Sequence, residues 1–143
     1  MRHCEEGYFE ICGKEIGPFL SPDGLGEKFD CYVSGKGVYA DTDKFNFSGR
    51  LFIADLYFYE NVIRKMFLYP VTEIQGAATQ KDEEERFRIS KEVLQSLFGK
   101  PHEEKENMVI YRYGWGNIFL KKTKNLFSGG AIHICYQEEK NNG

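Results

Sequence analysis

GRLFIADLYFYENVIRKMFLYPV, residues 49–71, is the stretch that most clearly indicates the fold. Aromatic and β-branched residues occur throughout it, and this composition is typical of β-strands. Glu60 and Asn61 interrupt the run near its middle. Asn tolerates the positive φ that tight hairpin turns need. The stretch therefore predicts two antiparallel strands joined by a turn near Glu60 and Asn61.

The composition of the whole chain agrees with a sheet-rich domain. The 143 residues include twelve Phe, nine Tyr and 15 Gly, and 41% of them are hydrophobic. This length and this apolar content are typical of one folded domain, residues 1–143. Only residues 79–99 have the pattern of a helix of several turns. We expect an α+β fold in which helices pack on one face of an antiparallel β-sheet.

An internal repeat organises these elements. Three pairs of blocks recur in the same order. They are LSPDGLGEKF (20–29) with ISKEVLQSLF (89–98), YVSGKGV (32–38) with YRYGWGNI (111–118), and FSGRLFI (47–53) with FSGGAIHI (127–134). Such self-similarity is the sequence signature of duplicated units. We therefore predict two helix–strand units, about 15–71 and 87–137, joined by a connector at about 72–86.

The first block of each unit has the chemistry of a helix start. Ser21 and Ser90 are suitable N-caps, and Pro22 follows the first of them at a position where a missing N–H is tolerated. Gly99 marks the end of the second helix. The acidic run 82–85 falls in the connector, where we expect it to be solvated.

The second unit resembles a known repeat. Its matching residues follow a helix, Phe-Gly-Lys-Pro, polar loop and Tyr-x-Tyr-Gly order, and they are Leu94, Phe98, Gly99, Pro101, Tyr111, Tyr113 and Gly114. The pattern resembles the tandem α–β repeats of β-lactamase-inhibitor-like and outer-membrane-assembly-lipoprotein-like domains. The resemblance implies that helices cover one sheet face and that the other face binds a protein. The general character of the chain is also similar to that of small bacterial immunity proteins.

Charge and cysteine content limit the class of partner and the compartment. The net charge of −3 argues against a nucleic-acid binder, and residues 1–30 carry seven acidic and three basic groups. The four cysteines form no Cys-x-x-Cys pair. The N-terminal residues have the pattern of neither a secretory signal nor a lipobox, and no apolar run is long enough to span a membrane. We expect a cytoplasmic protein with reduced thiols.

Motifs for catalysis or cofactor binding are weak. Both Gly-x-Gly pairs, at residues 35–37 and 114–116, precede β-like residues, so they predict turns and not a phosphate-binding loop. His133 and Cys135 could join His3 and Cys4 only in an atypical metal site. No Gly-x-Ser-x-Gly elbow is present. We therefore expect no cofactor, no metal and no catalytic residues.

The aromatic residues of 111–115 can be interpreted in more than one way. Tyr111, Tyr113 and Trp115 alternate along the sequence and could share one face of a strand. That face packs inward against a helix, presents anchors to another protein, or forms a platform on which nucleic-acid bases stack, and the acidic chain fits a protein partner better than nucleic acid.

The sequence favours a non-catalytic protein-binding module, an immunity-type inhibitor that covers the active face of a toxin such as a basic toxin domain. The candidate partner-binding residues are Tyr57, Tyr59, Tyr113, Trp115, Asp41 and Asp43. A small enzyme or ligand-binding domain with a cleft between the two units is the alternative hypothesis, and a homo-oligomeric structural protein is a third.

Overall fold

The computed structural model describes residues 4–72, 80–122 and 129–137. It contains a nine-stranded sheet, a two-stranded hairpin and, within these residues, one α-helix, α1 (Gln80–Phe98). The predicted α+β class and the antiparallel sheet are confirmed.

The small hairpin consists of β1 (Phe9–Ile11) and β2 (Lys14–Ile16), and two 3-10 turns are η1 (Cys4–Glu6) and η2 (Pro22–Gly24). The large sheet consists of β3 (Phe29–Ser34), β4 (Gly37–Thr42), β5 (Phe45–Phe47), β6 (Arg50–Tyr59), β7 (Val62–Pro70), β8 (Glu103–Lys105), β9 (Met108–Tyr113), β10 (Gly116–Lys121) and β11 (Ile132–Tyr136).

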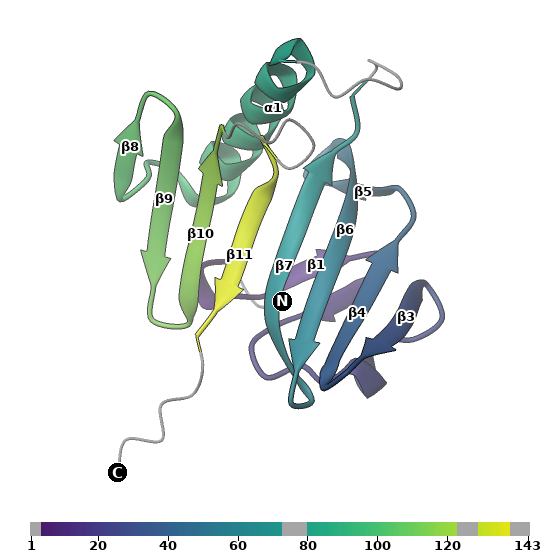
Figure 1. Ribbon diagram of the computed structural model, residues 1–143. Coiled ribbons are helices and arrows are strands. Elements are labelled where there is room, and N and C mark those ends of the chain that lie inside the picture. The colour runs from purple at the N-terminus through teal and green to yellow at the C-terminus, as the bar shows by residue number, and fades with distance from the viewer. Residues whose placement is uncertain (1–3, 73–79, 123–128, 138–143) are drawn as a thin grey trace.

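The long β6–β7 hairpin lies near the middle of the sheet, as Figure 1 shows. The strand order is β3-β4-β6-β7-β11-β10-β9-β8. Strand β5 pairs with the first three residues of β6. Glu60 and Asn61 have φ values of 51° and 69°, which is the left-handed pair that a two-residue type I′ turn requires. The predicted strands and their turn are therefore confirmed.

Two meanders meet at the centre of the sheet. Strands β3, β4, β6 and β7 follow one another across one half, and β8, β9, β10 and β11 follow one another across the other. The halves join where β7 pairs with β11. The matched blocks do not occupy equivalent places in this order, because YVSGKGV (32–38) forms the β3–β4 hairpin whereas YRYGWGNI (111–118) forms the β9–β10 hairpin.

The prediction of two helix–strand units is not supported, because the first unit has no α-helix. Residues 22–24 form only the 3-10 turn η2, and the Ser21 side chain makes no capping hydrogen bond. Gly24 and Gly26 disfavour a helix at this point. Strand β3 then begins at Phe29, so few residues are left in which a helix could propagate.

Helix α1 begins earlier than the repeat suggested. It starts at Gln80, so Ser90 is an interior residue whose hydroxyl donates to the Gly130 carbonyl (2.7 Å) and not an N-cap. Asp82 and Glu83 are buried, which corrects the expectation of a solvated acidic run. The helix ends as predicted at Gly99, which has φ 76° and whose N–H donates to the Gln95 carbonyl.

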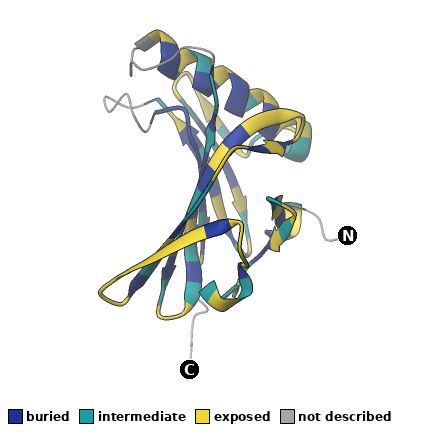
Figure 2. Ribbon diagram, turned by 90° about the vertical axis from the view of Figure 1, so that its right-hand side faces the viewer, coloured by how far each residue is buried: buried dark blue, intermediate teal, exposed yellow. Residues whose placement is uncertain are grey.

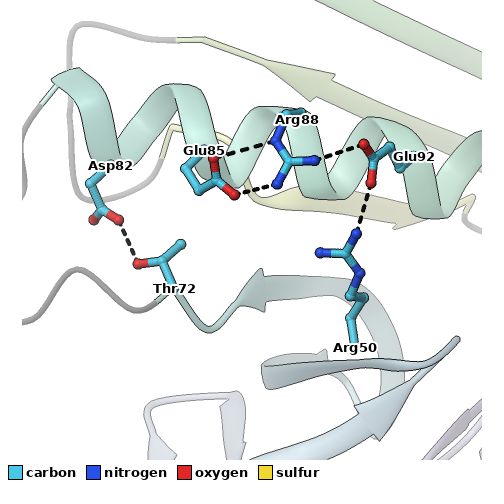
Figure 3. A network of polar contacts seen from close by, with 6 residues as sticks. All are labelled: Arg50, Thr72, Asp82, Glu85, Arg88 and Glu92. Atoms are coloured by element: carbon cyan, nitrogen blue, oxygen red, sulfur yellow. Dashed lines mark hydrogen bonds and ion pairs between the residues drawn. The ribbon is translucent and has the colours of Figure 1, made fainter.

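Polar contacts fasten α1 to the sheet, and Figure 3 shows several of them. At the start of the helix, Thr72 donates to Asp82 (2.5 Å), and Asp82 also pairs with the buried Arg86. Farther along, Arg50 of β6 pairs with Glu92 (2.9 Å). The Arg50–Glu92 pair is exposed and is expected to contribute little, whereas the buried Arg86 donates to the Gly129 carbonyl (2.9 Å) and so connects the helix to the segment before β11.

The hydrophobic core lies between one face of the sheet and the elements that cover it. Helix α1 packs on β7 and β10, and it also contacts η1. The β1–β2 hairpin adds Phe9, whose ring lies 6.2 Å from that of Phe98 at the end of α1. In Figure 2, buried residues follow this layer, whereas exposed residues occur along the β3–β4 end of the sheet.

The two Gly-x-Gly segments are turns, as predicted. Gly35 has φ 61° at the first position of the two-residue β3–β4 turn, as a type II′ turn requires. In the β9–β10 turn the glycines differ. A Cβ on Gly114 would meet no atom within 4 Å, but a Cβ on Gly116 would lie 2.1 Å from the Cys135 carbonyl oxygen. Gly116 therefore allows β10 and β11 to approach each other.

This difference predicts that two similar substitutions change the free energy of unfolding by very different amounts. Gly116→Ala should lower the free energy of unfolding by about 3 kcal/mol, because the new methyl group forces β10 away from β11. Gly114→Ala should change it by less than about 0.5 kcal/mol, because the site is open. Urea denaturation followed by circular dichroism measures both variants. Equal losses in the two variants would contradict this account of the turn.

Candidate functional site

Only one face of the large sheet is covered in the described part of the chain. We call the other face the open face. Along β6 it receives Leu51, Ile53, Asp55, Tyr57 and Tyr59, whereas the intervening residues are buried in the core. This alternation follows from the two-residue period of a β-strand. Because no described helix or strand lies over the open face, its side chains are available to a partner.

Three tyrosines form a ladder across the open face, and we call them the tyrosine ladder: Tyr32, Tyr39 and Tyr57. They lie at paired register positions on β3, β4 and β6. The Tyr32 and Tyr39 rings stack with centroids 5.4 Å apart, and the Tyr39 and Tyr57 centroids are 4.8 Å apart. Gly37 leaves room for the last ring, because a Cβ there would lie 2.9 Å from it. The ladder is thus a preformed aromatic surface.

Three aspartates form a second row beside the ladder, and we call them the aspartate row: Asp30, Asp41 and Asp55. Asp30 pairs in register with Asp41, and Asp41 pairs with Asp55. Like charges directly opposite one another on neighbouring strands destabilise a sheet. The next residue in the row is Phe67 on β7, so no cation occupies the following register position.

Asp55 is the member of the aspartate row whose pKa is shifted. Burial, followed by the hydrogen bond and the negative charge of Asp41, raises the pKa of Asp55 to about 6, and this value includes the opposing effect of the hydrogen bond from Tyr69. Burial also raises the pKa of Tyr69, together with the charge of Asp55. The pair Asp41–Asp55 therefore holds its second negative charge at a cost in free energy, as close carboxylates do.

The other half of the open face is apolar at its centre and basic around it. The His133 ring lies 4.8 Å from that of Phe67 and 4.6 Å from that of Phe119. Burial, and then the charges of Lys121 and Lys65, lower the pKa of His133 to about 4. His133 is therefore a neutral aromatic residue at physiological pH.

The structure places three of the predicted binding residues together on the open face. Tyr57 belongs to the tyrosine ladder, and Asp41 belongs to the aspartate row. Tyr59 follows at the end of β6, where it lines a cavity of about 360 Å³ with Arg64 and Lys65. Asp43 is exposed beyond the end of β4, and its carboxylate accepts a hydrogen bond from the Lys44 amide (2.7 Å).

Tyr113 and Trp115 lie elsewhere, on the covered side of the sheet. Tyr113 has the same orientation as the fully buried Tyr111, and its ring lies 5.7 Å from that of Phe98. Trp115 is in the β9–β10 turn, stacks on Tyr113 and donates its indole N–H to the Glu5 carbonyl (2.8 Å). Of the two orientations considered from the sequence, inward packing is the one observed.

Sequence reasoning missed most members of the two rows. Tyr32, Tyr39, Asp30 and Asp55 are separated by up to 25 positions, and only the strand register brings them together. A signal was present, because aromatic and acidic residues alternate with apolar ones in 30–41 and 51–59. Correct pairing of those strands would have revealed the site.

The described residues offer little support for a metal site or a membrane span. They contain no group of three or more His, Cys, Asp or Glu side chains arranged to hold a metal ion. His3 lies outside them, and the thiols of Cys4 and Cys135 are free. None of their helices is long and apolar enough to cross a bilayer.

Cavities occur on both sides of the sheet. One of about 300 Å³ lies beside the β1–β2 hairpin and is lined mainly by Tyr8, Phe9, Glu10 and Phe47. Another, of about 440 Å³, lies between α1 and the ends of β6 and β7. The junction of the two meanders is itself closed by the paired strands β7 and β11, so the predicted cleft between units has no counterpart there in the sheet backbone.

Comparison of the chain with protein-family models, with curated proteins and with solved structures gave no match.

The Asp41–Asp55 pair predicts a specific titration. Because the pKa of Asp55 is raised from 3.8 to about 6, protonation favours the folded state. The pair's contribution to stability should be largest below pH 3.8 and should be lost as the pH rises through about 6. Asp41→Asn should lower the pKa of Asp55, and Tyr69→Phe should raise it. Carboxyl-carbon NMR measures both shifts, and shifts in the same direction would contradict the assigned contacts.

Proposed function

We propose that this protein is a non-catalytic protein-binding module, an immunity-type inhibitor that covers the active face of a basic toxin domain with its open face. The observation that carries the proposal is the tyrosine ladder beside the aspartate row. Both rows lie on a face that no described element covers.

The tyrosine ladder supports protein binding through its area and rigidity. Tyr32 is 52% exposed and Tyr39 is 38% exposed, although both belong to paired strands. Tyrosine is enriched among the residues that dominate binding energy at protein interfaces. Because the rings already stack on one another, binding would order few additional side-chain rotamers.

The aspartate row supports a basic partner. Asp30, Asp41 and Asp55 lie next to one another without a cation at the next register position. A lysine or arginine of a partner would reduce the repulsion between Asp41 and Asp55 while gaining its own ion pair. Opposite charges across an interface also increase the association rate and discriminate against wrong partners. A nuclease-type toxin domain, whose active face is basic, has the required chemistry.

The test uses the product of the neighbouring upstream gene as the partner. Purified proteins should form a complex, and co-expression should restore growth to cells that produce the neighbour. Asp41→Lys and Tyr39→Ala should each weaken binding about tenfold or more, measured by isothermal titration calorimetry. Affinity should also fall as salt concentration rises, because solvent ions screen the aspartate row.

Glu84→Lys is the matched control. It makes the same charge change as an acid-to-lysine substitution on the open face, but it lies at an exposed position of α1, on the covered side. It should bind like the wild type. The proposal fails if no complex forms with the neighbouring product, or if Asp41→Lys and Glu84→Lys weaken binding equally.

A further inference from the structure

The two edges of the large sheet differ in how they are protected, and Figure 1 shows them on opposite sides. Edge strand β8 has only three residues, and all of them are charged. Edge strand β3 has six residues, Phe29–Ser34, with neither proline nor lysine and with an unbroken register to β4. Short strands, lysines, prolines and bulges are the usual devices that prevent edge pairing. Strand β3 has none of these four, and Asp30 is its one charged residue.

Strand β3 also exposes apolar groups on both of its faces. Tyr32 on the open face is 52% exposed, and Val33 on the opposite face is 75% exposed. Cys31, which shares a face with Val33, is exposed as well. Figure 2, viewed from the side of this edge, shows exposed residues at this end of the sheet. An additional strand beside β3 would cover groups on both faces at once.

The β3–β4 turn determines which backbone groups of β3 are available. Ser34 and Gly37 close a two-residue turn, and such a closing pair is hydrogen-bonded. Hydrogen-bonded and non-hydrogen-bonded pairs alternate along antiparallel strands. Tyr32 and Ser34 therefore direct their backbone groups toward β4, whereas Cys31 and Val33 direct theirs to the outer edge. The free edge thus has two adjacent sets of donors and acceptors.

We propose that β3 pairs with β3 of a second copy of this chain, antiparallel and centred on Tyr32, so that the two large sheets become continuous. In this register Tyr32 lies opposite Tyr32 of the second copy, in a non-hydrogen-bonded pair, where side chains are closest. Cys31 lies opposite Val33, twice, in hydrogen-bonded pairs. Asp30 lies opposite Ser34, so no two carboxylates face each other.

This register is self-complementary, and it therefore favours a second copy of the chain over an unrelated strand as the partner of β3. A two-fold axis perpendicular to the sheet places a ring against a ring and an apolar residue against an apolar residue. Within each copy, the Tyr32 ring stacks on Tyr39, and the side of the Tyr32 ring that faces the sheet edge is exposed to solvent. Pairing would cover that side and would join two three-ring ladders into one. Lys28 and Lys36 lie beyond the paired strand ends, where solvent screens them.

The proposed pairing occurs at the sheet edge and does not require the partner proposed for the open face, although Tyr32 belongs to both surfaces. The perpendicular axis leaves the open faces of both copies on the same side of the joined sheet. The partner-binding test and the test of pairing can therefore fail separately.

The first experiment measures mass by light scattering at protein concentrations from about 5 µM to about 1 mM. The wild-type mass should rise from the 16.6 kDa of a single chain toward twice that value. Tyr32→Lys should remain a single chain at every concentration, because it places two ammonium groups opposite each other at the axis. Ile53→Lys adds the same charge to the open face but away from the edge, and it should behave like the wild type.

The second experiment tests the register by covalent trapping. Tyr32→Cys places two thiols opposite each other at the axis, within the Cβ separation that a disulfide needs. Under mild oxidation it should give a covalent dimer on a non-reducing gel. Ser34→Cys, whose thiol would face Asp30 on the same side of the sheet, should give no more than the wild-type background.

Three results would overturn the proposal. A wild-type chain that stays single throughout the concentration range excludes the pairing. Loss of the dimer in Ile53→Lys but not in Tyr32→Lys would show that the open faces pair instead. Equal trapping of Tyr32→Cys and Ser34→Cys would exclude the register centred on Tyr32.

Discussion

A nine-stranded sheet has two faces, and the described elements of this chain are enough to cover only one of them. Alternate residues of every strand point to opposite faces, so each strand that contributes to the core must also contribute to the open face. The central strands β6 and β7 therefore need side chains that tolerate water on one side while the other side is fully apolar. Tyrosine and aspartate meet this need, and they supply the features from which a binding surface can be built.

The covered face is fixed by the way in which α1 is attached. Asp82 pairs with Arg86 in a buried position, Thr72 donates to Asp82, and Arg86 donates to the Gly129 carbonyl (2.9 Å). These contacts connect the helix to the segments after β7 and before β11. A Cβ on Gly130 would lie 2.7 Å from the Arg86 Cβ and 2.8 Å from the Phe87 backbone nitrogen, so the close approach requires glycine. Since a buried ion pair is costly when one partner is missing, the attachment depends on the full set of contacts.

Local patterns in the sequence were sufficient where the structure is local. The β6–β7 hairpin followed from its strand composition and from Asn61, and the end of α1 followed from Gly99. The helix predicted after Ser21 does not form, because a favourable N-cap residue does not compensate for two glycines in a short segment. Tyr113 and Trp115 were assigned to a partner surface, although their alternation with Tyr111 was read correctly, because alternation groups residues on one face without showing which face of the sheet is covered.

The aspartate row and the tyrosine ladder could not be read from alternation alone, because they depend on register between strands far apart in sequence. The same register explains why the edge and the open face are linked. Tyr32 is both the outermost ring of the ladder and the central residue of edge strand β3. Joining two copies through β3 would therefore place two aspartate rows on one continuous surface, one on each side of the junction. A basic partner with two binding patches would then gain affinity through the higher effective concentration of the second row, with no new contact required.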